Sequence, residues 1–135
     1  MVLFYANGAH ATSWENEPSE SIIGIHLLSE YGSKYRFISK QVSSEIIQTE
    51  LGKLDWKHKF YQFVVVIKPG ISMEVGGSLN QHDGLSAMYR NRHKKVDAVI
   101  ISPPTSVNQM AEILLSFIKA DGTWKEKYAF EFVSY

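Results

Sequence analysis

The stretch that decides the fold of this 135-residue chain is Phe60-Tyr61-Gln62-Phe63-Val64-Val65-Val66-Ile67, which Pro69-Gly70 brings to an end. It is a nearly unbroken run of apolar and β-branched residues. Such a run, bounded by turn residues, is typical of a strand buried on both faces of a sheet. We therefore expect residues 60–67 to form a central strand. The segment from Ile71 to Val75 follows so closely that antiparallel pairing of the two is the simplest connection.

Further segments with strand-like composition lie on both sides of this strand. Tyr35 to Ser39 alternates apolar and polar residues and, with the apolar stretch from Ser21 to Ser29, predicts a hairpin around a turn at residues 31–34. The remaining expected strands span residues 2–6, 85–89, 96–102 and 128–135. Asn7-Gly8 predicts a turn after the first of them, and the polar residues around 14–18 predict a surface loop.

Two segments have apolar residues at helical spacing. The first is preceded by Ser43 or Ser44 as N-cap and carries Val42, Ile46, Ile47, Leu51 and Leu54. The second begins after Thr105 or Ser106, ends before Asp121-Gly122, and carries Met110, Ile113, Leu114, Phe117 and Ile118. Together these elements predict an α+β fold, in which a mostly antiparallel sheet of about six strands has two helices packed on one face. The length fits a single domain over residues 1–135.

Composition limits the classes of function. Fourteen Lys and Arg balance fourteen Asp and Glu, which argues against a protein that mainly coats nucleic acid or an anionic membrane. The absence of Cys excludes disulfides, thiolate metal sites and cysteine nucleophiles. The apolar start has no basic region, and the apolar run at 63–67 is far below the roughly 20 residues that a membrane helix needs. We expect a soluble, cytoplasmic protein.

Residues able to do chemistry are few and poorly spaced. No two of the five histidines stand at i, i+2 or i, i+4, so we expect neither a metal site nor a cofactor; they are His10, His26, His58, His82 and His93. A small enzyme would need Ser78, His82 and Asp83 to converge in a pocket. Asp83-Gly84 is better explained as a turn, and Gly76-Gly77 lacks the Lys-Ser/Thr and the helix of a phosphate loop. We therefore predict no catalytic residues, and keep a small enzyme as an alternative.

The densest basic cluster is Arg90, Arg92, His93, Lys94 and Lys95, beside Tyr89. It predicts a basic turn, which offers few phosphate contacts in a chain of zero net charge. A nucleic-acid binder would need this cluster to join Lys53, Lys57, Lys59 or Lys68 in one surface stripe. Nucleic-acid binding through residues 90–95 is the second alternative.

The first fifty residues carry six acidic and three basic side chains, so the front of the chain is acidic. Glu15, Glu17, Glu20 and Glu30 flank Trp14 and Tyr31. This mixture suits a basic protein partner, because carboxylates steer the encounter while a buried aromatic ring supplies contact area. An ordinary polar loop has the same composition.

The C-terminal half of the chain has four features in sequence: a strand ending in a Gly-Gly turn (73–78), an Asp-Gly-Leu entry to the next strand (83–86), Pro103-Pro104, and a helix (115–118) that closes before Asp121-Gly122-Thr123-Trp124. In these features it resembles the immunity proteins of bacterial polymorphic toxin and contact-dependent growth inhibition systems. The resemblance implies a small cytoplasmic protein without catalysis, which binds a cognate toxin domain and covers its active site or substrate groove.

The resemblance and the acidic front half together predict a toxin-binding face. Its residues are Trp14, Glu15, Glu17, Glu20 and Glu30. A second candidate face joins the turn at residues 78–83 to the basic cluster, through Ser78, Asn80, His82, Asp83, Arg90 and Arg92. A partner at that second face would have to be acidic or hydrogen-bonding.

Overall fold

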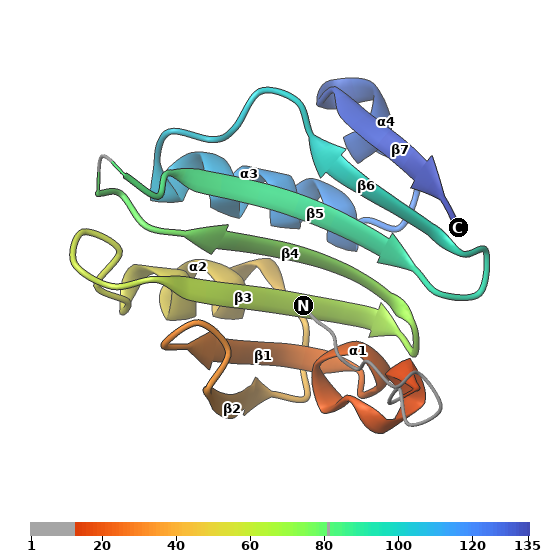
Figure 1. Cartoon of the computed structure of the whole chain (residues 1–135), viewed down its shortest axis with the longest axis horizontal. Helices are drawn as coiled ribbons and strands as arrows, with labels where there is room; N and C mark the ends of the chain where they lie inside the picture. The colour runs from red at the N-terminus through yellow and green to blue at the C-terminus, as the bar shows by residue number, and fades with distance from the viewer. Residues whose placement is uncertain (1–12, 81) are drawn as a thin grey trace.

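The computed structural model describes residues 13–80 and 82–135. They form an α+β fold around a seven-stranded antiparallel sheet in the order β2-β1-β3-β4-β5-β6-β7, with β2 and β7 at its two edges (Figure 1). The strands are β1 (Gly24–Ser29), β2 (Lys34–Ser39), β3 (Tyr61–Lys68), β4 (Ile71–Gly77), β5 (Leu85–Asn91), β6 (Val96–Ile100) and β7 (Phe130–Ser134). The sheet thus has seven strands rather than about six. The expected strand at 2–6 and the turn at Asn7-Gly8 lie outside the described residues.

The prediction of a central strand buried on both faces is confirmed. β3 lies between β1 and β4, where alternate side chains point to opposite faces. Phe63 and Val65 are wholly buried on one face, and Val64 and Val66 are buried on the other. A strand of this kind needs cover on both faces, and helices supply it.

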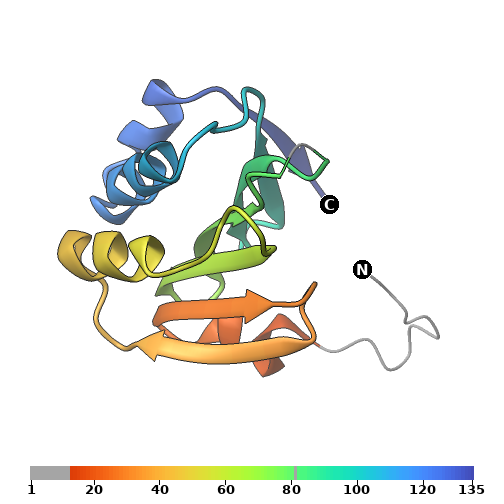
Figure 2. The same cartoon turned by 90° about the vertical axis from the view of Figure 1, so that its left-hand side faces the viewer.

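Two helices cover the face to which Phe63 and Val65 point, as predicted. They are α2 (Ser44–Gly52) and α3 (Val107–Ile118), and Figure 2 shows both on the same side of the sheet. Ser43 and Ser106 are the N-caps, each accepting a hydrogen bond from the backbone N–H three residues later. Met110, Leu114 and Phe117 of α3 belong to the same hydrophobic core as Phe63 and Val65. We call this side of the sheet the helix face.

The opposite side, which we call the second face, is covered in part by the short helix α1 (Pro18–Ser21). Figure 1 shows α1 in front of the sheet and α2 and α3 behind it, and α1 contacts β1, β3 and β4. A 3₁₀ helix, η2 (Trp14–Asn16), precedes α1. The expectation of a surface loop at 14–18 is therefore wrong: Ser13 caps η2, and Pro18 occupies the first turn of α1, where its fixed φ suits a helix.

Two further differences from the sequence analysis lie in the C-terminal half. A short helix, α4 (Thr123–Lys127), follows Asp121-Gly122 and buries Trp124. The Gly-Gly pair belongs to β4 rather than to a turn. A Cβ on Gly77 would lie 2.0 Å from the backbone oxygen of Gly84, and its φ of +110° is open only to glycine, so the close approach of the two backbones requires glycine here. No helix of the described residues is both long and apolar enough to cross a membrane.

His26 ties α1 to the second face. Its ring is wholly buried in β1, with Nε2 2.7 Å from the backbone oxygen of Ile22, just after α1, and Nδ1 2.8 Å from the Tyr35 hydroxyl of β2. A carbonyl oxygen only accepts, so Nε2 carries the proton and the neutral ring accepts the Tyr35 O–H at Nδ1. Burial lowers the pKa of His26, and the hydrogen bond to Ile22 offsets this only in part.

We expect this histidine to make stability depend on pH. Its pKa in the folded protein is below the ordinary value of 6.5, so the unfolded chain binds the proton first. The free energy of unfolding should therefore be fully kept above pH 6.5 and should fall as pH decreases through the folded pKa. Urea unfolding of the parent and of His26→Gln between about pH 7.5 and pH 5.5 measures this pH dependence of the free energy of unfolding. A difference between the two that stays constant with pH would contradict the prediction.

Candidate functional site

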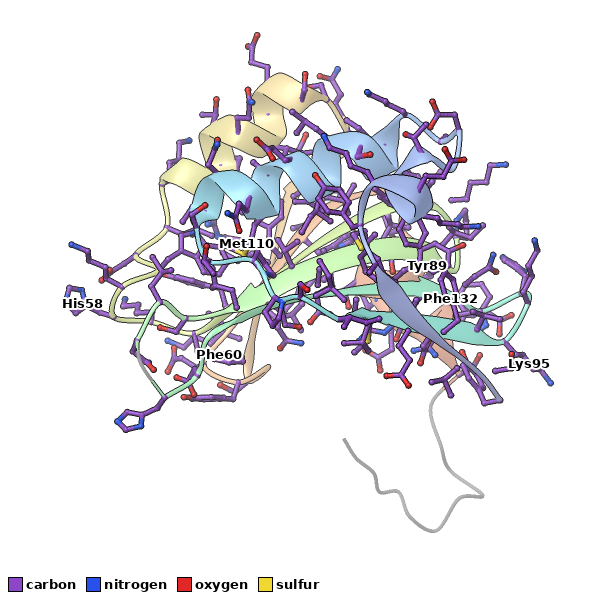
Figure 3. All side chains as sticks on the ribbon, turned by 90° about the horizontal axis from the view of Figure 1, so that it is seen from above. His58, Phe60, Tyr89, Lys95, Met110 and Phe132 are labelled. Carbon is purple, nitrogen blue, oxygen red and sulfur yellow. The ribbon has the colours of Figure 1, made fainter. Side chains whose placement is uncertain are left out.

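The structure divides the five predicted toxin-binding residues between opposite ends of the sheet. Trp14 and Glu15 lie in η2, Glu20 lies in α1 and Glu17 is the residue between the two helices, beside the β3–β4 and β5–β6 turns; we call this the Trp14 end. Glu30 lies in the β1–β2 turn, near the α2–β3 loop and the β4–β5 loop; we call this the Tyr31 end. Figure 3 shows the separation, with His58 and Phe60 at one end of the molecule and Lys95 at the other.

Trp14 is half-buried at its end of the sheet. Its ring meets His93 of the β5–β6 turn edge to face, with centroids 5.3 Å apart. Gly70 of the β3–β4 turn lies beneath the indole, and a Cβ there would approach the ring to 3.0 Å. Trp14 therefore serves to fasten η2 to two turns, while Glu15 and Glu17 stay exposed.

Arg92 is the centre of an ion-pair network at the Trp14 end. Its Nε donates to Glu20 Oε1 at 2.6 Å and its Nη1 donates to the Tyr135 hydroxyl at 2.6 Å, while Asp97 Oδ1 is 3.7 Å from Nη1. Burial by itself would lower the pKa of Arg92, but the hydrogen bonds and charges of Glu20 and Tyr135 more than offset it and raise that pKa. Glu20 is thus engaged within the molecule.

This network brings the acidic and the basic cluster of the sequence together. α1 lies against the β5–β6 turn, and a hollow of about 350 Å³ between them is lined by both signs of charge; its residues are Trp14, Glu17, Glu20, Arg92, Lys95 and Tyr135. Opposite charges this close cancel much of each other's field in the solvent beyond them. The Trp14 end is therefore less acidic than the front half of the sequence suggests.

Arg90 is not part of the basic turn, contrary to the sequence analysis. It lies in β5 on the second face, where its Nη1 is 2.9 Å from Glu74 Oε1 of β4. Gln62 of β3 donates to the other oxygen of Glu74 at 3.1 Å. The turn itself covers only residues 92–95.

The stripe that a nucleic-acid binder needs is not formed. Lys53, Lys57 and Lys59 lie in the α2–β3 loop at the Tyr31 end, at the opposite end of the sheet from the turn at 92–95. Only Lys68, the last residue of β3, shares an end with that turn. Since Arg90 and Arg92 are both ion-paired, few free cations remain there to contact phosphates.

The Tyr31 end displays an exposed aromatic pair. Tyr31, 74% exposed, has the largest exposed fraction of any large hydrophobic side chain in the described chain. Its ring stacks on Phe60 of the α2–β3 loop, with centroids 4.7 Å apart and an interplanar angle of 20°. Stacking holds in place a side chain that would otherwise sample several rotamers.

The backbone beneath Tyr31 is strained. Glu30 and Tyr31 have φ of +51° and +58°, values that bulky residues rarely adopt. Hydrogen bonds from Gly32 N to Ser29 O and from Ser33 N to Glu30 O close the turn. Strain of this kind persists where the surroundings enforce it and often marks a functional position. The turn thus presents Tyr31 outward in a fixed orientation.

Two hollows lie on either side of the aromatic pair and share Tyr31, Phe60 and Asp83 in their walls. The larger, of about 450 Å³, also has Glu30, His58 and Asn80 in its lining. The smaller, of about 390 Å³, extends along β3 and β4 to Gln62 and Glu74. The Tyr31–Phe60 pair thus stands as a ridge between two open hollows, with carboxylates at their borders. A protruding side chain of a partner protein could occupy either hollow.

Asn80 orders the β4–β5 loop that borders these hollows. Its Oδ1 accepts hydrogen bonds from the backbone N–H of His82 and of Asp83, and its Nδ2 donates to Asp83 Oδ2 at 2.7 Å. The Ser78 hydroxyl is buried and donates to the backbone oxygen of Trp56. The second candidate face is therefore divided as well, because Arg90 and Arg92 lie elsewhere.

The residues of the enzyme alternative are not brought into contact. Ser78 points inward to Trp56, whereas His82 and Asp83 are exposed, and among the described hydrogen bonds none joins the side chains of these three residues. One exposed His–Asp pair does form, between His58 Nδ1 and Asp55 Oδ1 at 3.0 Å, at a spacing of three residues that carries no motif in the sequence. In residues 13–80 and 82–135, no three His, Asp or Glu side chains are grouped so as to hold a metal ion.

The pairing of Tyr31 with Phe60 was not predicted. The sequence places Tyr31 in a turn beside Glu30, among aromatic residues suited to a partner, and it places Phe60 at the start of a buried strand. The two rings meet because β1 pairs with β3 so that Ser29 stands opposite Tyr61. Nothing in the local sequence encodes that neighbour relation, although an aromatic residue in a turn before Gly32 is a signal of exposure.

We expect Arg92 to be required for stability rather than for contact with a partner. Arg92→Ala leaves Glu20 and the buried Asp97 Oδ1 without their cation, and should lower the free energy of unfolding by about 2 kcal/mol. Lys94→Ala, an exposed change in the same turn, should alter it by less than about 0.5 kcal/mol. Urea unfolding followed by tryptophan fluorescence measures both, and equal effects of the two changes would contradict the prediction.

Comparisons with known proteins returned no match to a family model, to a curated protein or to a solved structure. Any proposal of function for this chain therefore starts from the geometry of its two ends and from what its sequence leads us to expect.

Proposed function

We propose that this protein is an immunity protein, which binds a cognate bacterial toxin domain in the cytoplasm and neutralises it by covering its active site or substrate groove. It performs no catalysis in this role and uses no cofactor. The observation that carries the proposal is the Tyr31 end, where a rigid aromatic pair stands between two hollows. Tight protein complexes are anchored by such aromatic residues, because a ring that is already fixed loses little conformational entropy on binding.

The Tyr31 end supports this function better than the Trp14 end. At the Trp14 end, Trp14 and Glu20 are engaged in fastening η2 and α1 to the turns. At the Tyr31 end, Tyr31 is presented outward, and Glu30 and Asp83 border the hollows beside it. Glu30 is the one residue of the predicted toxin-binding face at this end, and Asn80 and Asp83 of the second candidate face also line the larger hollow.

The toxin surface that fits this end has a cleft for Tyr31 and basic groups near it. Carboxylates at the rim of an interface act mainly on the rate of association, whereas a buried aromatic anchor acts on the rate of dissociation. Glu30 already forms an exposed ion pair with Lys34, with Nζ and Oε2 2.8 Å apart. This pairing limits how strongly the Glu30 carboxylate attracts an approaching toxin. Contact by the ring is therefore expected to dominate the affinity.

The experiment uses the C-terminal domain encoded by the reading frame immediately upstream of this chain as the probe. We expect the two proteins to form a stable one-to-one complex, and co-expression to restore growth. Tyr31→Ala should raise the dissociation constant roughly 30-fold, as loss of an aromatic anchor does, because the two hollows lose the ridge between them. Titration calorimetry and growth measure the two effects.

Ile23→Ala is the matched control, since Ile23 is an exposed apolar residue at the other end of β1. It should bind like the parent. Glu15→Lys with Glu17→Lys tests the Trp14 end: loss of binding in this variant with none in Tyr31→Ala would move the site and leave the function standing. Failure of the parent chain to bind or to protect would overturn the function itself.

A further inference from the structure

The two edges of the sheet differ in how well they are protected. Within residues 13–80 and 82–135, β2 pairs only with β1 and β7 only with β6. Figure 1 shows the two strands at opposite margins of the sheet. An edge strand has a row of free N–H and C=O groups, and natural proteins usually protect such a row from other chains.

β2 carries protective features. Lys34 and Arg36 place two positive charges on this strand, and the register with β1 shifts between Ile25 and His26. Charges and irregular pairing are recognised means of keeping a further strand away from an edge. β7 has the sequence Phe130-Glu131-Phe132-Val133-Ser134, in which Glu131 is the single charge, and its pairing with β6 is regular.

The free hydrogen-bonding groups of β7 follow from its pairing with β6. Ile101 N donates to Ala129 O before the strand begins, and Tyr135 N donates to Lys95 O after it ends. Bonded and non-bonded positions alternate along an antiparallel pair, so Glu131 and Val133 also bond to β6. The N–H and C=O groups of the three residues between them therefore point away from the sheet; these are Phe130, Phe132 and Ser134.

Exposed apolar side chains lie on both faces of the sheet along this row, and together we call them the β7 patch. Five of the eleven exposed large hydrophobic residues lie on β7, at its end or on the neighbouring β6 segment, so this patch holds nearly half of them; they are Val99, Ile101, Phe132, Val133 and Tyr135. Val133 is 55% exposed, and Phe132 is 47% exposed although its ring stacks on Trp124 of α4. A free backbone row within an apolar patch fits an extended chain of similar character.

We propose that β7 pairs antiparallel with β7 of a second copy of this chain, about a two-fold axis through Phe132. In this register Phe132 stands opposite Phe132 of the partner subunit, and Phe130 stands opposite Ser134 of the partner subunit. All three outward-facing residues then meet their counterparts in hydrogen-bonded positions, with about six backbone hydrogen bonds across the axis. The two sheets join into one continuous sheet.

The side chains of β7 are self-complementary in this register. On the helix face the two Phe132 rings meet at the axis, and aromatic pairs across strands are favourable. On the second face each Glu131 stands opposite Val133 of the partner subunit, so no like charges face each other. A two-fold register that matches every free backbone group and opposes no charges makes a second copy the best-fitting occupant. This edge is distinct from the Tyr31 end, so the proposal does not rest on the proposed function.

The first test uses the absence of Cys from the chain. In a hydrogen-bonded antiparallel pair the two Cα atoms are about 5.5 Å apart, which a disulfide can bridge. Oxidation of Phe132→Cys should therefore yield a covalent dimer. Val99→Cys is the matched control, because Val99 is similarly exposed but lies one strand further from the axis. Equal cross-linking of both variants would indicate random collision and would overturn the proposal.

The second test reverses charge at one exposed position, with sedimentation equilibrium of the full chain across the micromolar range as the readout. Val133→Glu places the new carboxylate opposite Glu131 of the partner subunit on both sides of the axis, and should raise the dimer dissociation constant about tenfold. Val133→Lys removes the same apolar side chain and should leave the dimer at least as stable. Adding Glu131→Lys to Val133→Glu should restore the dimer dissociation constant of the parent chain.

Several outcomes would overturn the proposal. A parent chain that stays monomeric throughout this range would overturn it. Assemblies that keep growing with concentration would also overturn it, because pairing of β7 with β2 of the next molecule builds an open chain of molecules and no closed dimer. Equal effects of Val133→Glu and Val133→Lys would also count against the register. Far-ultraviolet circular dichroism and thermal melting of each variant establish that the monomer fold is kept.

Discussion

Burial of β3 on both faces is the constraint on which the other features of this molecule depend. A strand that directs Phe63 and Val65 to one side and Val64 and Val66 to the other must be covered twice. α2 and α3 cover the helix face with a large apolar surface. Among the helices of residues 13–80 and 82–135, the second face is covered by the short α1, which is too small to be held by apolar contact alone. It is held by polar contacts instead, from His26 on one side and Arg92 on the other.

That need for cover explains why the acidic front of the chain is a structural element. Glu20 is a partner of Arg92, its backbone oxygen accepts a hydrogen bond from Gly70, and Trp14 packs over the same turn. We expect the loss of any of these contacts to loosen α1 from β3, with which it is in contact. An acidic, aromatic segment that reads as an interaction surface can equally be the cover of a sheet, and only its neighbours in space distinguish the two.

The sequence was sufficient for the features that depend on local pattern. The apolar run at 60–67 predicted β3, the serines before each periodic segment predicted the caps of α2 and α3, and the hairpin of β1 and β2 followed from alternation. What it could not supply were relations between distant segments: the stacking of Tyr31 on Phe60, the pairing of Arg90 with Glu74, and the contact of Glu20 with Arg92, 72 residues apart. Each of these depends on strand order, and the composition of neither partner specifies it. The short helices η2, α1 and α4 were missed because each is near one turn in length, below the length at which periodicity can be detected.

Electrostatics then bear on the kind of partner that the proposed function requires. Among the described residues, the acidic and basic clusters of the sequence meet at the Trp14 end and neutralise each other there, so this end is a poor imitation of a nucleic acid. A toxin bound by this protein would be recognised through shape and aromatic contact, with charge confined to the rim. Interfaces of that kind depend less on salt than do those formed by charge mimicry, because few counterions are released on binding. The edge at β7 likewise carries little charge, with Glu131 as its single charged residue, and so does not repel a second copy of the chain. Low surface charge therefore favours both the proposed contact with a toxin and the proposed contact with a second copy.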